Sequence, residues 1–238
     1  MFSDCDALTS AVIPEGVEEI GEKAFCRCWH LRRLVLPDSV TTIGARAFLG
    51  THRLDISIPP TVVSIGREAF YVSGMRTLTI PESLTEIESW SFAHCPRLEQ
   101  VTIPDTVRDV GSETFKYCSN LKRVRMGSGI EELKDQFREC ESLERIVIPA
   151  SVRRIGPEPF TGCRALKHIV VDPENPYFDS RNDCNAIIQT EENRLIAGCQ
   201  STVIPDTVVT IGTDAFSKCE GLRHIEIPES VQDRKSVV

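Results

Sequence analysis

The sequence lacks long hydrophobic runs and an excess of basic charge, and each absence excludes a class of protein. No apolar stretch of the 238 residues approaches the roughly 20 that a transmembrane helix needs, so membrane insertion is excluded. Lys and Arg total 27 against 35 Asp and Glu, which gives a net charge of -8. This balance argues against delocalised binding of nucleic acid or anionic lipid. With 41% hydrophobic residues, the chain still has enough apolar material for a substantial core.

The sequence also lacks the signals of secretion and of the common catalytic and metal sites. Residues 1–6 contain neither a basic n-region nor an apolar h-region, so the chain either stays inside the cell or is a piece of a longer protein. The motifs G-x-S-x-G, G-x-x-x-x-G-K-[ST], G-x-G-x-x-G, C-x-x-C and H-x-x-x-H are all absent. We therefore expect no enzyme, no metal site and no cofactor. The histidines are expected at the surface: His30, His52, His94, His168 and His224.

A repeat of 22 or 23 residues occupies almost the whole chain. Successive copies of its phenylalanine lie 23, 23, 22, 22, 23, 22, 23 and then 56 residues apart. The unit reads L-x-x-V-x-I-P-x-x-V-x-x-I-G-x-x-A-F-x-x-C, and one clean copy runs from Leu98 to Cys118. The phenylalanines that mark the repeat are Phe2, Phe25, Phe48, Phe70, Phe92, Phe115, Phe137, Phe160 and Phe216.

Each unit predicts one coil of a solenoid. Period-2 apolar pairs such as Val101 and Ile103 indicate a short strand that the following proline ends. A second apolar pair precedes a glycine, which suits a tight bend. The A-F-x-x-C segment is expected to form a short helical or 3-10 turn with its phenylalanine at the centre of the coil. Because each coil buries its apolar residues only against its neighbours, about ten coils must stack into one solenoid domain over residues 1–238.

The pattern I-P-x-S-V-x-x-I-G-x-x-A-F with its periodic cysteine closely resembles the BspA-like leucine-rich repeat family of bacterial and protist surface proteins. The resemblance covers the chain from Phe2 to Val231. It implies a right-handed superhelix, mainly of parallel β structure, with a sheet on its concave side. It also implies adhesion or protein binding at cell surfaces and no catalytic residues. The departures from the pattern are local: Gly127 for the proline, Glu88 and Lys134 for the glycine, and Thr51 and Ser73 for the cysteine.

An insertion of 33 residues separates Phe160 from Phe216 and begins V-D-P-E-N-P-Y-F, which also looks familiar from that family. Short apolar runs at 186–188 and 195–197 flank a polar turn, so a β-hairpin is expected within about 172–201, anchored by Tyr177 and Phe178. The insertion either extends the solenoid or contacts a ligand. Both ends of the chain fall mid-repeat, which favours a fragment or a divergent short gene product, with end-to-end association of stacks as the alternative.

The cysteines follow the period of the repeat rather than the spacing of a zinc site. On adjacent coils their Cα atoms would lie about 4.8 Å apart, but parallel Cβ vectors leave the Cβ atoms farther apart than the roughly 3.8 Å that a disulfide prefers. A reduced, buried ladder is therefore expected, whereas a bridge between Cys184 and Cys199 of the insertion stays open. The members of the ladder are Cys5, Cys28, Cys95, Cys118, Cys140, Cys163 and Cys219.

In the strands predicted from the L-x-x-V-x-I segments, the outward-facing positions are not fixed by packing. Basic residues gather at these positions. Arg123, Arg125 and Arg145 fall on adjacent coils, where planar guanidinium groups suit a carboxylate or a sulfate. The alternative is that these charges are merely tolerated, or neutralised by Glu99 and Glu144. The predicted ligand-binding residues of the concave face are Arg123, Arg125, Arg145, Lys122, Lys167, His168 and Arg33.

The leading hypothesis is a non-enzymatic recognition or adhesion module whose concave strands bind a protein or glycoprotein, such as a host or extracellular-matrix component. The competing hypothesis is a structural spacer of a larger surface protein that has no ligand of its own. A shared fold does not by itself establish recognition, because function depends on the residues of the site. The resemblance implies a cell-surface or secreted protein. Since no signal peptide is visible, a cytoplasmic location stays open.

Overall fold

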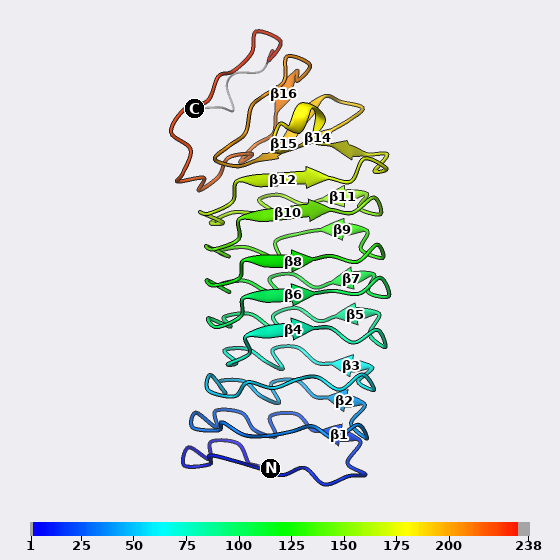
Figure 1. Cartoon of the computed structure of the whole chain (residues 1–238), viewed down its shortest axis with the longest axis vertical. Helices are drawn as coiled ribbons and strands as arrows, with labels where there is room; N and C mark the ends of the chain where they lie inside the picture. The colour runs from blue at the N-terminus through cyan, green and yellow to red at the C-terminus, as the bar shows by residue number, and fades with distance from the viewer. Residues whose placement is uncertain (1, 233–238) are drawn as a thin grey trace.

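The chain folds as a stack of coils that rises from the N-terminus along the longest axis of the molecule (Figure 1). This computed structural model describes residues 2–232. The L-x-x-V-x-I segment forms the first strands, and the V-x-x-I segment forms the second strands. The first strands are β4 (Thr77–Thr79), β6 (Gln100–Thr102), β8 (Arg123–Arg125), β10 (Arg145–Ile148) and β12 (His168–Val171). In the described coils before β4, the first segment has only an isolated bridge between Ser10 and Arg33. The second strands are β1 (Glu19–Ile20), β2 (Thr42–Ile43), β3 (Ser64–Ile65), β5 (Glu86–Ile87), β7 (Asp109–Val110), β9 (Glu132–Leu133), β11 (Arg154–Ile155) and β16 (Thr210–Ile211).

Paired strands of neighbouring coils are parallel, with equivalent repeat positions opposite each other. Val101 of β6, for example, pairs with Leu78 of β4 on one side and with Val124 of β8 on the other. Along β10, Ile146 and Ile148 are buried while Arg145 and Val147 face solvent. The repeat therefore predicted the fold class, a mainly parallel β-solenoid, correctly.

The phenylalanines of the repeat form a continuous column in the core. Adjacent rings from Phe2 to Phe137 are stacked, with centroids 5.3 to 5.8 Å apart and ring planes within 15° of parallel. This column defines about seven regular turns, fewer than the ten coils counted from the sequence. The repeat continues beyond Phe137 through β12 and, after the insertion, β16, but the stacked column ends at Phe137, one repeat before the insertion.

The segment around each phenylalanine is a pair of turns and not the expected helical or 3-10 turn. Glu113 and Tyr117, two residues before and after Phe115, have φ of 57° and 59°. Such left-handed residues prevent a helix from continuing. Successive N–H groups alternate instead: Lys116 donates within its own turn, to Glu113, whereas Phe115 donates to the next coil. The described part of the chain has a single 3-10 helix, η1 (Arg181–Asp183), and it lies in the insertion.

The repeat glycine keeps the second strands hydrogen-bonded from coil to coil. Gly44 and Gly66 each donate a backbone hydrogen bond to the isoleucine of the preceding coil, at 2.7 and 2.8 Å. An added Cβ at either glycine would lie 2.6 Å from a backbone nitrogen of that coil, so side chains are excluded at this spacing. Where Glu88 and Lys134 replace the glycine, the second sheet is interrupted: β3 does not pair with β5, nor β7 with β9.

The insertion forms the expected hairpin and is held mainly by a residue that the sequence did not single out. Strands β14 (Ala186–Gln189) and β15 (Arg194–Gly198) pair antiparallel, with β13 (Phe178–Asp179) on the other side of β14. Phe178 is buried as expected, whereas Tyr177 is 47% exposed and contributes through its backbone. The buried amide of Asn175 donates to the carbonyls of Pro149 and Val152 and accepts the N–H groups of residues 177 and 178, so its four hydrogen bonds join the insertion to the solenoid.

The cysteine ladder is present in reduced form, and each buried member is hydrogen-bonded. The thiol of Cys118 donates to the carbonyl of Phe92 in the preceding coil at 3.2 Å, and Cys140 donates to Phe115 at the same distance. The cysteines, including Cys184 and Cys199, are free thiols. The ladder members Cys5 and Cys219, which lie toward the two ends of the stack, are less well buried.

Candidate functional site

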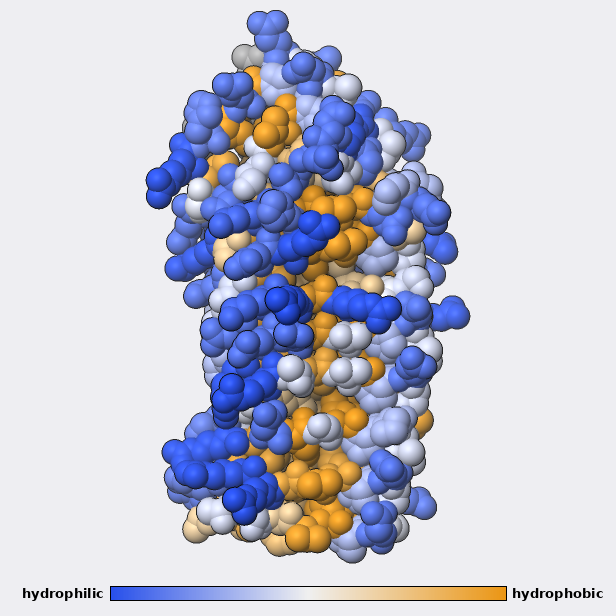
Figure 2. Space-filling view, in the orientation of Figure 1, coloured by the Kyte–Doolittle hydropathy of each residue, from blue (hydrophilic) through white to orange (hydrophobic). Residues whose placement is uncertain are grey.

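The predicted basic residues lie on the exposed face of the first strands. Arg123 and Arg125 occupy both ends of β8, Arg145 begins β10, and all three side chains face solvent. They project because the inward positions between them are taken by core residues. Figure 2 shows strongly hydrophilic residues over this part of the stack, beside an apolar stripe that runs along it. We refer to these three residues as the arginine cluster.

The arginine cluster spans a break in the first sheet. Arg123 pairs with Gln100 and Arg125 with Thr102 across β6 and β8, whereas β10 pairs with β12 and not with β8. Strands β8 and β10 are neighbours all the same (Figure 1). The cluster therefore joins two separately hydrogen-bonded parts of the sheet, which the regular repeat did not indicate.

Neutralisation by a neighbouring carboxylate applies to Lys122 and not to the arginine cluster. Lys122 lies 3.9 Å from Glu99 on the coil below, in a column where basic and acidic residues alternate from Arg76 through Glu144 to Lys167. Within residues 2–232, no carboxylate oxygen lies within 4.0 Å of a guanidinium nitrogen of the cluster. The charge of the cluster is thus not paired, whereas that of Lys122 is partly compensated.

Asp105 is an acidic residue whose carboxyl pKa is influenced by Ser128 and by the charge of Arg125 in the cluster. Hydrogen bonds from Ser128 hold the pKa of its carboxyl below the usual range, and the charge of Arg125 adds to this effect. Asp105 is fully exposed, so its interaction with Arg125 is screened by solvent. It leaves the guanidinium available to a ligand.

The two remaining predicted residues lie at different distances from the cluster. His168 is opposite Arg145 in the register of β10 and β12, and its Nδ1 lies 3.3 Å from the side-chain oxygen of Asn185 in the insertion. Arg33 forms an isolated parallel β-bridge with Ser10 near the N-terminal end of the stack. The structure therefore brings His168 to the arginine cluster and leaves Arg33 outside it.

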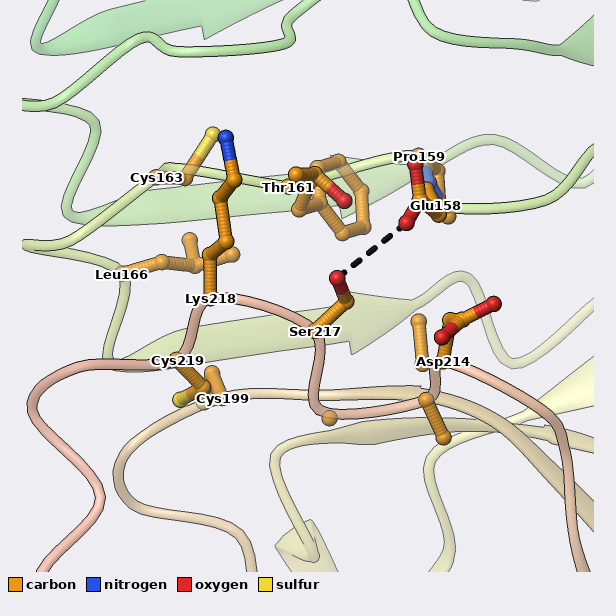
Figure 3. Close-up of a pocket in the computed structure, with 14 residues that line it drawn as sticks. Glu158, Pro159, Thr161, Cys163, Leu166, Cys199, Asp214, Ser217, Lys218 and Cys219 are labelled. Carbon is orange, nitrogen blue, oxygen red and sulfur yellow. Dashed lines mark hydrogen bonds between the residues drawn. The ribbon is translucent and has the colours of Figure 1, made fainter. Parts of the chain in front are cut away.

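A small cavity lies where the last coil meets the solenoid across the insertion (Figure 3). Lys218 forms an ion pair of 2.7 Å with the buried carboxylate of Glu139, and Ser217 donates to Glu158 at 3.1 Å. The hydroxyl of Thr161 is buried there without a hydrogen-bond partner among the described residues. A volume of about 20 Å³ admits water rather than an organic ligand. These contacts fasten the last coil to the solenoid.

An aromatic column on the turn side was not anticipated from the sequence. The ring of His94 lies 4.9 Å from Tyr71 and 4.5 Å from Tyr117, and Lys116 sits 4.9 Å from the ring of Trp90. Burial, followed by the charge of Lys116, lowers the pKa of His94. His94 therefore lies at the surface, as expected, but it is half-buried between aromatic rings and not freely solvated. Its signal was the recurrence of aromatic residues near the phenylalanine of successive repeats.

The part of the chain that the structure describes contains neither a metal-binding group of side chains nor a membrane-spanning helix. No group of three or more His, Cys, Asp and Glu side chains is arranged to hold a metal ion in residues 2–232. Over the same residues, no helix is long and apolar enough to span a bilayer.

Comparison with known proteins identifies the repeat. Residues 1–122, 54–167 and 195–237 match the family described as "BspA type Leucine rich repeat region", in 6 copies. A leucine-rich cell surface protein of Faecalibacterium prausnitzii is 28% identical with a TM-score of 0.50, covering 99% of this chain and 62% of that one. The leucine-rich repeat protein TpLRR of T. pallidum is 31% identical with a TM-score of 0.59, covering 66% and 77%.

The pneumococcal vaccine antigen PcpA has a TM-score of 0.67 over 94% of this chain and 64% of its own; at 19% identity it shows a likeness of fold alone. No curated protein matches the sequence. The chain spans 62% of the length of the Faecalibacterium protein. Its repeat, its parallel strands and these matches agree: the chain belongs to the BspA-type leucine-rich repeat family.

Proposed function

We propose that the protein is a non-enzymatic recognition module that binds a protein or glycoprotein through the exposed face of its first strands. The observation that carries the proposal is the arginine cluster, three exposed guanidinium groups on neighbouring strands that have no carboxylate partner among residues 2–232. A preorganised surface binds without the cost of ordering loops. Forked guanidinium donors match carboxylate and sulfate oxygens.

The similar structures support a location at the cell surface. One of them is described as a cell surface protein and another as a vaccine antigen. We accordingly propose that this chain acts outside the cell, against host or matrix components. The single solenoid domain over residues 1–238 and the end-to-end association of stacks stay predictions, which one unfolding transition and sedimentation measurements would test.

The test is binding of the chain to an array of matrix proteins, mucins and sulfated glycans, compared with a variant that changes Arg123, Arg125 and Arg145 to Glu. A control variant changes Arg108, Arg153 and Arg154 to Glu, exposed arginines in and beside the second strands, which alters net charge equally away from the cluster. Because Arg153 and Arg154 pair with Glu131 and Glu132, circular dichroism must show that this variant is folded. Salt-sensitive binding that only the first variant loses supports recognition by the cluster. If neither the wild type nor the control binds anything, the spacer function replaces the proposal.

A further inference from the structure

Two parallel rows of side chains cross the exposed face of β8, β10 and β12. The first row is basic: Arg123, Arg145 and His168 occupy the first position of the three strands. Two residues along each strand, the second row begins with Arg125 and continues with Val147 and Val170. Val147 is 40% exposed and Val170 is half-buried, so this row presents aliphatic surface to solvent.

Both rows are short because their ends are closed by uncharged groups. Below β8, the equivalent positions on β6 are Gln100 and Thr102. Above β12, the insertion contacts the basic row through Asn185 and His168. Three strands cover about 10 Å at the usual strand spacing. The site thus fits two or three anionic groups, not a long polyanion.

An extended peptide has the geometry to use both rows together. Its side chains alternate in direction, and like-facing side chains repeat about every 6.6 Å. Along each row the residues of adjacent strands lie about 4.8 Å apart, so the basic row covers about 10 Å and accommodates two like-facing side chains of a peptide that runs along it. A peptide lying across the strands between the rows would direct one set of side chains toward Arg145 and the other toward Val147.

We propose, as a refinement that rests on the proposed function, that the arginine cluster binds an extended protein segment in which acidic and aliphatic residues alternate. The acidic side chains pair with the basic row, and the aliphatic ones cover Val147 and Val170. A sulfated glycan or a free anion would use the arginines equally well but would gain little from an aliphatic row. The exposed valines therefore favour a peptide.

The test uses a fluorescein-labelled peptide with the core Glu-Val-Glu-Val-Glu and fluorescence anisotropy against the full chain. Its isomer Glu-Glu-Glu-Val-Val has the same composition without the alternation. A sulfated disaccharide serves as competitor. Two variants report on the rows separately: Arg145→Glu on the basic row and Val147→Ser on the aliphatic row. Val35→Ser, at a position 79% exposed nearer the N-terminal end, is the matched control.

We expect the alternating peptide to bind, with affinity reduced about tenfold by Arg145→Glu and about threefold by Val147→Ser, and unchanged by Val35→Ser. The isomer should bind several-fold more weakly. Equal binding of both peptides, indifference to Val147→Ser, or no peptide binding at all overturns the inference. If the disaccharide binds more tightly than the peptide and depends on Arg145, recognition by the cluster stands and only the peptide assignment fails.

Discussion

The side-chain oxygen of Gln136 accepts a hydrogen bond of 2.7 Å from the backbone N–H of Lys134. The amide nitrogen of the same side chain donates to the carbonyl of Val110 at 2.9 Å. These are the two backbone groups that would bond directly if position 134 were glycine, as Gly156 does with Leu133. Gln136 is buried and thus restores, through its side chain, the link between coils that the substitution of the glycine removes.

Replacing Gln136 by Leu should therefore destabilise the protein by about 2 to 3 kcal/mol, since it leaves one buried donor and one buried acceptor without partners. The measurement is urea unfolding followed by circular dichroism. The double variant Lys134→Gly with Gln136→Ala should regain much of this loss, because the direct hydrogen bond can form again. A double variant no more stable than Gln136→Leu would contradict this account.

A second prediction concerns the amide that fastens the insertion. Asn175→Asp should cost about 3 kcal/mol, because a carboxylate cannot donate to the carbonyls of Pro149 and Val152 and would be buried beside them. Hydrogen exchange should show lost protection within β13 and β14 while β4 and β6 keep theirs. Tyr177→Ala, which alters an exposed neighbour, is the control and should have little effect. Uniform loss of protection would mean that Asn175 supports the whole solenoid instead.

Features of the fold that recur with the repeat could be predicted from the sequence, whereas features that depend on single residues could not. Strands, hairpin, reduced thiols and the exposure of Arg123 follow from repeat phase and from apolar alternation. The turns were mispredicted because residues such as Val72 and Tyr117 adopt positive φ without the glycine that normally signals it. The interruption of the sheet between β8 and β10 was also not predicted, since the apolar alternation of the repeat is unchanged there.

A third prediction tests the fastening of the last coil. Gly162 has φ of 78°, and an added Cβ would press against the carboxylate of Glu139, which passes over it to reach Lys218. Gly162→Ala should therefore cost about 2 kcal/mol or more, through backbone strain and loss of the ion pair. Limited proteolysis should cut faster after the insertion. Glu139→Gln removes the ion pair and the buried charge together, without backbone strain, and should show a smaller effect; equal effects would exclude strain as the cause.

The fourth prediction is a loss of stability at alkaline pH caused by the cysteine ladder. Burial raises the pKa of Cys163 to about 12 and keeps those of Cys118 and Cys140 well above the usual value. Above the pKa of the unfolded chain, near 9, the folded state retains these protons while the unfolded state releases them. Folding stability is therefore fully present below pH 9 and falls as pH rises toward 12, by about 1.4 kcal/mol per pH unit for each such thiol.

Urea unfolding under reducing conditions between pH 8 and pH 10.5 measures this slope. Cys163→Ala lowers stability at every pH, because it leaves a cavity and frees the carbonyl of Phe137. Its pH slope should nonetheless be shallower than that of the wild type by one proton, and this difference separates titration from packing. Thiol reagents at pH 8 should modify the buried ladder only as fast as the protein unfolds. Rapid modification of native protein, or identical slopes in the two proteins, would show that the ladder is open to solvent.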